Sequence, residues 1–246
     1  MNRKRPGGAR GILRQLCPPL VWNGLKSANA AMHRARRRQP PGGGSSEQDL
    51  GLYWDPKMAE LLDAWGEDTV WKEIQLLLVD RPGPVLDIAC GTGRVIEIVT
   101  AALPLEIHGC DISGLLIEKA LARGIPVSRL TVCDATVLPY ADDTYEYAYS
   151  IGSLEHFTED GIARFLSESN RVCRSGSFHN IPVSRSGRNE GWISPQQSYF
   201  NNSVEWWLAK FEAACESVTV IDSTWEDDQS VGKWFVSTKR RPGRGP

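Results

Sequence analysis

Three aspartates lie in or at the ends of apolar segments that are spaced regularly along the chain. Asp87 lies inside VLDIAC, Asp111 ends LEIHGCD, and Asp134 follows RLTVC. If these segments are neighbouring parallel strands, their carboxyl ends meet at one edge of a sheet, where open α/β sheets bind ligands. A carboxylate in the position of Asp111 accepts ribose hydroxyls, and Asp134 can reach an adenine amino group. The spacing therefore predicts a ligand that contains a nucleoside.

The segment that follows the first aspartate is a glycine turn. It consists of Cys90-Gly91-Thr92-Gly93, and its glycines allow a tight turn and a close approach of a ligand to the backbone. A dinucleotide site has a third glycine where Ile96 stands here, so the pattern argues against that ligand. The Asp87 carboxylate before the turn suits a cationic amino-acid group better than a pyrophosphate. A nicotinamide-dependent oxidoreductase remains the alternative from another enzyme class.

The elements that must position these residues alternate between strands and helices. Apolar runs and period-two patterns predict strands, whereas apolar residues at intervals of three or four predict helices. Strands are predicted at 85–90, 105–111, 129–135, 145–153, 177–184, 218–224 and 232–240, and helices at 94–103, 113–124, 161–173 and 203–215, after two helices within 58–80. This order indicates an α/β fold: a doubly wound, mostly parallel seven-stranded sheet with helices on both faces and an antiparallel edge.

With these elements in order, the chain resembles the class I S-adenosylmethionine-dependent methyltransferases, which have a Rossmann-like fold. The resemblance rests on Asp87-x-x-x-Gly91-x-Gly93, the acidic strand end at Asp111, Asp134-Ala135 and the segment LPYADDTYEYAYSIGSLEHF. It implies S-adenosylmethionine as the cofactor, with its methionine portion at the glycine turn, its ribose at Asp111 and its adenine at Asp134. The residues implied to bind the cofactor are Asp87, Ala89, Cys90, Gly91, Thr92, Gly93, Asp111, Ile112, Asp134, Ala135, Ser150, Ile151 and Gly152.

The segment GSLEHF supplies the candidate catalytic residues. Methyl transfer requires alignment of donor and nucleophile and, for an oxygen or nitrogen acceptor, removal of a proton. His156 and Glu155 follow the predicted fourth strand, and His156 is a candidate base or substrate contact because histidine titrates near neutral pH. Alternatively, His156 packs beneath the cofactor or caps the next helix. The cysteines at the strand ends are interpreted as small buried hydrophobic residues, so no metal site is predicted.

Substrate specificity is expected outside the cofactor half. The segment Tyr53–Pro56 is a candidate lid over the cofactor. A cluster of aromatic and amide side chains suits a sugar, a flat ring or a polar metabolite, or forms plain core. Its members are Trp192, Tyr199, Phe200, Asn201, Asn202, Trp206 and Trp207. The predicted function is therefore methyl transfer to a small molecule or glycan precursor. A non-catalytic S-adenosylmethionine-binding regulatory module is the alternative.

The charge of the chain is distributed unevenly. Its first 46 residues carry ten Lys or Arg and no Asp or Glu, whereas the remainder carries 18 basic and 30 acidic residues. The Pro, Gly and Ser residues within 39–49 indicate a flexible connector. We therefore expect a basic arm and linker at 1–49, the methyltransferase domain at 50–240 and a tail at 241–246.

The basic arm has three interpretations: a solubilising tail, a contact with an anionic membrane surface, or a nucleic-acid contact. The acidic body argues against nucleic acid, so no nucleic-acid partner is expected. The sequence contains no run of 18 apolar residues and no secretory signal pattern. A cytoplasmic location is expected, with peripheral contact at the inner membrane face left open.

Overall fold

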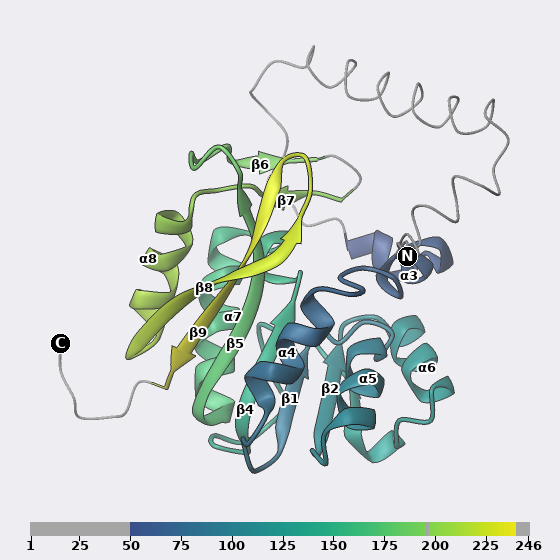
Figure 1. Ribbon diagram of the computed structural model, residues 1–246. Coiled ribbons are helices and arrows are strands. Elements are labelled where there is room, and N and C mark those ends of the chain that lie inside the picture. The colour runs from purple at the N-terminus through teal and green to yellow at the C-terminus, as the bar shows by residue number, and fades with distance from the viewer. Residues whose placement is uncertain (1–49, 195–196, 240–246) are drawn as a thin grey trace, which may run out of the picture. The chain divides into compact units, whose positions relative to one another are not determined.

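The computed structural model describes residues 50–194 and 197–239, and within them seven strands form one sheet in the order β3-β2-β1-β4-β5-β9-β8 (Figure 1). The pairs β1–β2, β1–β4, β2–β3 and β4–β5 are parallel, whereas β9 is antiparallel to β5 and β8. The strands are β1 (Val85–Ile88), β2 (Ile107–Asp111), β3 (Leu130–Val132), β4 (Tyr145–Ile151), β5 (Cys173–Ser184), β8 (Ser217–Glu226) and β9 (Ser230–Thr238). The predicted, mostly parallel sheet with an antiparallel edge is confirmed.

Helices cover both faces of this sheet (Figure 1). Side chains of α4, α5 and α6 share one apolar core, and side chains of α7 and α8 share the other. The helices are α3 (Pro56–Leu62), α4 (Val70–Leu78), α5 (Arg94–Ala102), α6 (Gly114–Ala122), α7 (Glu159–Val172) and α8 (Val204–Ala214), with 3₁₀ segments η1 (Leu50–Trp54), η2 (Val127–Arg129) and η3 (Leu154–His156).

The central strand β1 shows how the two cores are divided. All four of its residues are buried, because a parallel strand with helices on both faces has no solvent side. Successive side chains alternate between the faces. Val85 belongs to the core with α4, α5 and α6, whereas Leu86 and Ile88 belong to the core with α7 and α8. Asp87 therefore points to the same face as Val85.

Most predicted boundaries differ from the structure by one to four residues, and two of these differences matter for the site. The helix predicted at 161–173 ends one residue earlier, because Cys173 pairs with Tyr145 and begins β5. The strand predicted at 129–135 is shorter, because β3 ends at Val132 and the next three residues leave the β-ladder. The first difference arises from strand pairing, which helical periodicity does not report. Because β3 ends at Val132, residues 133–135 lie outside the ladder and line the cavity at the carboxyl ends of the strands.

Two short segments complete the described part of the chain. Between β5 and α8, strands β6 (Trp192–Ile193) and β7 (Tyr199–Phe200) form a two-stranded antiparallel ladder. At the other end of the described sequence, η1 contacts α3 and α6.

No helix among the described residues has the length and apolar character needed to cross a bilayer. The predicted basic arm and tail lie outside the described residues.

Candidate cofactor and acceptor site

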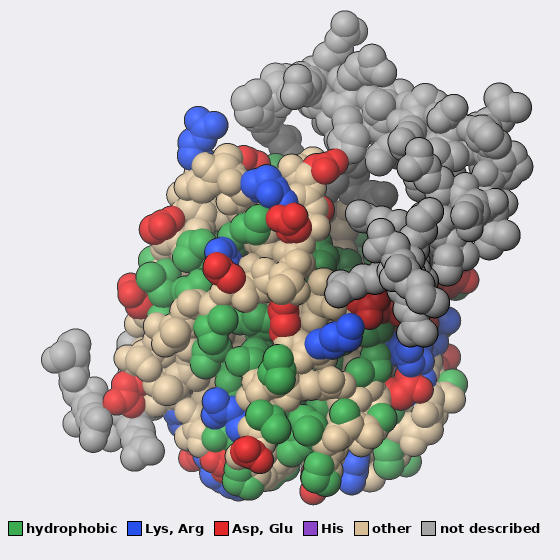
Figure 2. All heavy atoms as spheres, in the orientation of Figure 1, with side chains coloured by type: hydrophobic (Ala, Val, Ile, Leu, Met, Phe, Trp, Pro, Cys, Tyr) green, Lys and Arg blue, Asp and Glu red, His purple; other side chains and the backbone are tan. Residues whose placement is uncertain are grey.

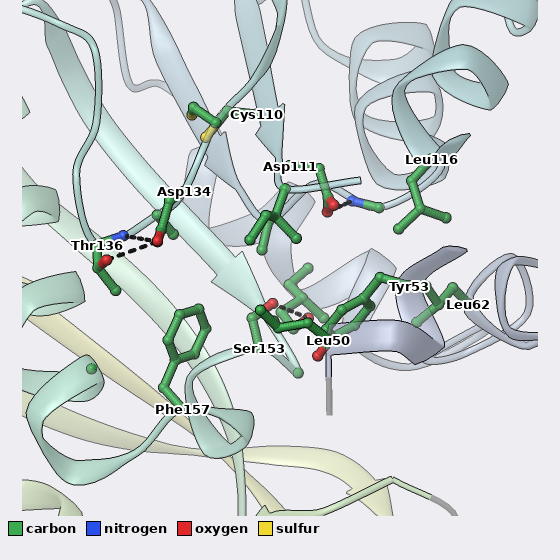
Figure 3. A pocket seen from close by; sticks show the side chains of 18 of the residues that line it. Leu50, Tyr53, Leu62, Cys110, Asp111, Leu116, Asp134, Thr136, Ser153 and Phe157 are labelled. Carbon is green, nitrogen blue, oxygen red and sulfur yellow. Dashed lines mark hydrogen bonds between the residues drawn. The ribbon is translucent and has the colours of Figure 1, made fainter. Parts of the chain in front are cut away.

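A cavity of about 190 Å³ lies where the carboxyl ends of the parallel strands meet. Figure 3 shows Asp111 and Asp134 on its walls, with Tyr53 and Leu50 approaching from η1. Its lining includes eight of the predicted cofactor-binding residues: Ala89, Gly91, Asp111, Ile112, Asp134, Ala135, Ile151 and Gly152. The structure thus brings the turn after β1 and the ends of β2, β3 and β4 to one hollow.

Asp111 is held in a fixed orientation by backbone donors. Its Oδ2 accepts the N–H of Gly91 and its Oδ1 accepts the N–H of Ser113, both at 2.9 Å. The residue is 7% exposed, and burial raises the pKa of its carboxyl, while these backbone N–H groups act in the opposite direction. A carboxylate oxygen has more than one lone-pair site, so both oxygens can still accept a hydrogen bond from a ligand. This geometry fits a ribose diol.

Asp134 is fixed through one oxygen only. Its Oδ1 accepts the backbone N–H of Thr136 at 2.7 Å and the Thr136 hydroxyl at 2.8 Å, which is an Asx turn. The described residues place no donor on Oδ2. Asp134 and Thr136 both line the cavity (Figure 3). The free oxygen is an acceptor that an exocyclic amino group can use.

The two glycines of the turn have different tasks. Gly91 lines the cavity at φ +55°, and a Cβ built on it would meet nothing nearer than Leu62 Cδ1 at 3.9 Å. Gly93 lies at φ +71°, and a Cβ there would lie 2.6 Å from Ile125 Cδ1 and 2.8 Å from Ala120 Cβ. Gly91 therefore leaves room for a ligand, whereas Gly93 lets α6 pack against the turn.

Five residues that the resemblance implied as cofactor-binding do not line the cavity: Asp87, Cys90, Thr92, Gly93 and Ser150. Asp87 lies opposite Tyr149 in the β1–β4 register, and burial raises the pKa of its carboxyl well above the usual range. The Thr92 hydroxyl donates to Asp63, and the Ser150 hydroxyl is hydrogen-bonded to His179 Nδ1 at 2.8 Å. For Thr92 and Ser150, the side chains are thus engaged by protein partners outside the cavity.

Glu155 and His156 lie beside the cavity and are absent from its lining. His156 Nδ1 donates to the Ser198 carbonyl oxygen at 2.8 Å, so Nε2 carries the lone pair of the neutral ring. Burial lowers the pKa of His156 to about 4 and raises the pKa of Glu155 to about 8. His156 Nε2 and Glu155 Oε1 are 3.7 Å apart. At neutral pH the pair is thus an uncharged imidazole beside a protonated carboxyl, and its catalytic role stays a prediction.

Only one residue of the predicted lid lines the cavity, namely Tyr53. Asp55 instead caps α3 by accepting the N–H of Lys57 at 2.9 Å, and Pro56 is the first residue of that helix. Trp54 is 47% exposed. The segment Tyr53–Pro56 is therefore a short cover followed by a helix start.

Several lining residues were not predicted from the sequence. They include Leu62, Thr136, Phe157, Arg164 and Gln197. Phe157 ends the LEHF segment and Thr136 follows Asp134-Ala135, so both lie next to recognised motifs. Gln197 lies next to the predicted aromatic and amide cluster but was not named in it, because its contact with Tyr53, 144 residues away, appears only in the folded chain.

Comparison with known proteins identifies the domain. Residues 85–176 match the family model described as a methyltransferase domain. The chain is 35% identical over 115 residues to the probable tRNA methyltransferase 9B of Mus musculus, covering 45% of this chain and 24% of that protein. It is 34% identical over 118 residues to the ubiquinone/menaquinone biosynthesis C-methyltransferase UbiE of Desulfotalea psychrophila, covering 45% and 46%. The chain thus spans less than half the length of these relatives.

A solved structure extends the similarity of fold beyond the matched residues. The 1,6-didemethyltoxoflavin-N1-methyltransferase of Burkholderia thailandensis, with bound S-adenosylhomocysteine, superimposes with a TM-score of 0.54 at 16% identity, and 92% of each chain is covered. That likeness supports the fold.

The relatives also correct one expectation. The aromatic and amide residues outside the cofactor half led us to expect a small-molecule or glycan acceptor, and the acidic body of the chain led us to expect no nucleic-acid partner. This expectation is wrong, because relatives over the cofactor half include the mouse tRNA methyltransferase above and a tRNA (carboxymethyluridine(34)-5-O)-methyltransferase of Arabidopsis thaliana. Net charge describes solubility and non-specific binding and does not identify a substrate.

The family match, the order of the sheet and the carboxylates at its strand ends agree on both fold and cofactor. The chain has the fold of the class I S-adenosylmethionine-dependent methyltransferases, and its residues 85–176 match a methyltransferase domain.

Proposed function

We propose that this chain transfers the methyl group of S-adenosylmethionine to a nucleoside of a tRNA. The observation that carries the donor half of the proposal is the fixed Asp111 carboxylate, which faces the cavity between the N–H groups of Gly91 and Ser113. Asp111 would hold the ribose hydroxyls, the free oxygen of Asp134 the adenine amino group, and Gly91 would admit the donor close to the backbone. S-adenosylmethionine supplies an electrophilic methyl group on a sulfonium.

The protein's own part in this reaction is to align the acceptor and accept its proton. His156 is the candidate for the second task, because Nδ1 is occupied by the Ser198 carbonyl and Nε2 is the basic nitrogen. Burial lowers the pKa of His156 to about 4, so at pH 7 the imidazole is uncharged and Nε2 can accept a proton as a weak base. Since His156 lies beside the cavity, it would act on an acceptor that enters from the side of η3.

The choice of a tRNA acceptor rests on two observations. Relatives at 31–35% identity over the cofactor half are described as tRNA methyltransferases. The first 46 residues carry ten Lys or Arg without an acidic residue, a composition that binds phosphate backbones. On the face shown in Figure 2, the Lys and Arg side chains of the described residues are interspersed with Asp and Glu. The arm is therefore the segment that would contact phosphates.

Donor binding is tested by titration calorimetry of the full chain with S-adenosylmethionine and S-adenosylhomocysteine. We expect one site for each ligand, and no change in NADH fluorescence on mixing with the protein. Failure to bind either ligand, or a clear NADH signal, would contradict the donor assignment.

The acceptor is tested with donor labelled in its methyl group, bulk tRNA and a low-molecular-weight metabolite extract. We expect label in tRNA that is lost after ribonuclease treatment. Label found only in the extract would overturn the tRNA proposal and favour a small molecule or glycan precursor. Donor binding without transfer to either fraction would favour a non-catalytic binding module.

The arm is tested by replacing Arg36, Arg37 and Arg38 with alanine. The association constant for tRNA decreases with salt, and each phosphate contact contributes about 0.7 to 0.9 to the steepness of log K against log salt. If all three arginines contact phosphates, the slope should become shallower by roughly 2 to 3. The matched control is Arg174→Ala, whose half-exposed side chain lies on the sheet. An unchanged slope in the triple variant would show that the arm does not bind RNA.

A further inference from the structure

A series of hydrogen bonds leads from Asp111 to the cover of the cavity. The Asp111 carboxylate accepts the N–H of Ser113 at 2.9 Å, and the Ser113 hydroxyl donates to the Tyr53 carbonyl oxygen at 2.6 Å. Ser113 is fully buried and also caps α6 by accepting the N–H of Leu116. The backbone of η1 at Tyr53 is therefore tied to the residue that orients the predicted ribose-binding carboxylate.

The Tyr53 side chain continues this series to the other wall. Its hydroxyl accepts Gln197 Nε2 at 2.6 Å, and both residues line the cavity. The next residue, Ser198, provides the carbonyl that accepts His156 Nδ1 at 2.8 Å. Tyr53 thus joins the donor side of the cavity to the segment that holds His156, although 144 residues separate it from Gln197.

Tyr53 is fixed at its backbone and at its hydroxyl by two different parts of the fold. Its carbonyl is held from the start of α6, and its hydroxyl is held from the segment next to β7. Figure 3 shows Tyr53 on the wall of the cavity beside Leu50, below Asp111 in this view. If η1 shifted, the orientation of Gln197 and Ser198 would lose its support, and the His156 ring would lose a fixed acceptor.

We propose that Tyr53 is a positioning residue that couples donor binding at Asp111 to the placement of His156, through Ser113 on one side and the Gln197–Ser198 pair on the other. The proposal rests on donor binding as proposed above and adds a consequence. Donor bound at Asp111 stabilises η1 in the position held by these two hydrogen bonds, and η1 in that position holds His156 where an acceptor arrives. An acceptor should then meet a fully arranged site only after the donor has bound.

The test follows the His156 ring directly. The chain has four histidines, so ¹⁵N-labelled imidazole spectra of the full chain are simple, and His156→Gln assigns the signal. On addition of S-adenosylhomocysteine to the wild type, we expect the His156 signal to shift. In Tyr53→Phe, which removes only the hydroxyl, and in Gln197→Ala, we expect the ligand still to bind while that shift is lost or greatly reduced.

A kinetic measurement supports the same test. Loss of this partly buried hydrogen bond should raise the dissociation rate of S-adenosylhomocysteine on the order of 3- to 10-fold in Tyr53→Phe. The matched control is Tyr147→Phe, a tyrosine of β4 that lies outside the cavity lining. It should leave both the rate and the His156 shift unchanged.

The outcomes separate this inference from the proposed function. If the wild type does not bind S-adenosylhomocysteine, the donor assignment fails. If it binds but the His156 signal does not move, or moves equally in Tyr53→Phe, the coupling through Tyr53 is wrong while the donor site stands.

Discussion

The Oδ2 atom of Asp111 accepts the backbone N–H of Gly91 at 2.9 Å, and this bond ties the end of β2 to the turn after β1. It arises because β1 and β2 are parallel neighbours, so their carboxyl ends lie side by side. The same carboxylate thus shapes the glycine turn and faces the cavity. Its loss should affect donor binding more than a change at any exposed carboxylate.

Replacing Asp111 with asparagine should weaken the affinity for S-adenosylhomocysteine by roughly 30-fold or more. An amide nitrogen cannot accept the Gly91 N–H or a ribose hydroxyl, and loss of a charge-assisted hydrogen bond costs about 2 kcal/mol. Titration calorimetry measures the change. Asp68→Asn is the control, because the Asp68 side chain is 84% exposed. An affinity for the Asp111 variant within about twofold of the wild type would refute the ribose assignment.

The two glycines of the turn should respond differently to alanine. Gly93→Ala forces a methyl group against Ile125 and Ala120 at positive φ and should lower the free energy of unfolding by about 2 to 5 kcal/mol. The methyl group of Gly91→Ala meets open space, so the only cost is that of a left-handed backbone at a residue with a side chain. The free energy of unfolding should fall by about 1 to 2 kcal/mol. The same methyl group enters the cavity and should reduce donor affinity. Urea unfolding and calorimetry on both variants separate the effects, and equal losses of stability would contradict the assigned tasks.

Glu155 should make the protein less stable as the pH rises. Its pKa is raised from 4.5 to about 8, so between these values the unfolded chain has released a proton that the folded chain retains. The free energy of unfolding should therefore fall across this window, by roughly 1.4 kcal/mol per pH unit at most. Glu155→Gln should reduce the fall, measured by urea unfolding from pH 5 to 8. The exposed Glu118→Gln serves as control, and an unchanged profile for Glu155→Gln would count against a buried, protonated carboxyl.

His156 should make the protein less stable as the pH falls below 6.5. Its pKa is lowered from 6.5 to about 4, so the unfolded chain binds a proton in this window that the folded chain does not. Stability is complete above pH 6.5 and should decline as the pH falls toward 4. In His156→Gln part of that decline should disappear, whereas His108→Gln, on the partly exposed side of β2, should keep it. A decline of the same size in both variants would argue against the burial of an uncharged imidazole.

Arg123 should stabilise the glycine turn from outside the cavity. Its Nε donates to the Thr92 carbonyl at 3.0 Å, and its guanidinium pairs with Glu97 at 2.9 Å and Asp63 at 2.8 Å. The side chain is 21% exposed, so solvent screens these bonds in part. Arg123→Met should lower the free energy of unfolding by about 1 to 3 kcal/mol. Arg174→Met, at a half-exposed pair of 3.5 Å, should change it by less than about 1 kcal/mol. Equal effects would show that the three contacts add nothing.

Much of the fold follows from local pattern. Apolar periodicity predicts the order of strands and helices, and the end of an apolar run marks where a parallel strand ends. Asp111 and Asp134 could therefore be placed on one edge before any contact was known. The strand–helix boundary at Cys173 could not, because it depends on pairing with Tyr145.

The face to which an individual side chain points could be seen only in the assembled sheet. Tyr149 and Ser150 are adjacent on β4, yet Tyr149 lies opposite Asp87 in one core while the Ser150 hydroxyl contacts His179 in the other. Alternation along a strand is certain from the sequence, but which set faces a cavity depends on the helices that cover each face.

The sequence by itself determined the fold class, the methyl donor and the two carboxylates that line the cavity, because these follow from short motifs and from the fixed geometry of parallel strands. Only the tertiary structure decided that Tyr53 meets Gln197 at the cavity, that the Ser198 carbonyl holds His156, and that His156 and Glu155 lie beside the cavity as an uncharged pair. Contacts across 42 to 144 residues, and the burial that shifts a pKa, exist only once the chain has folded.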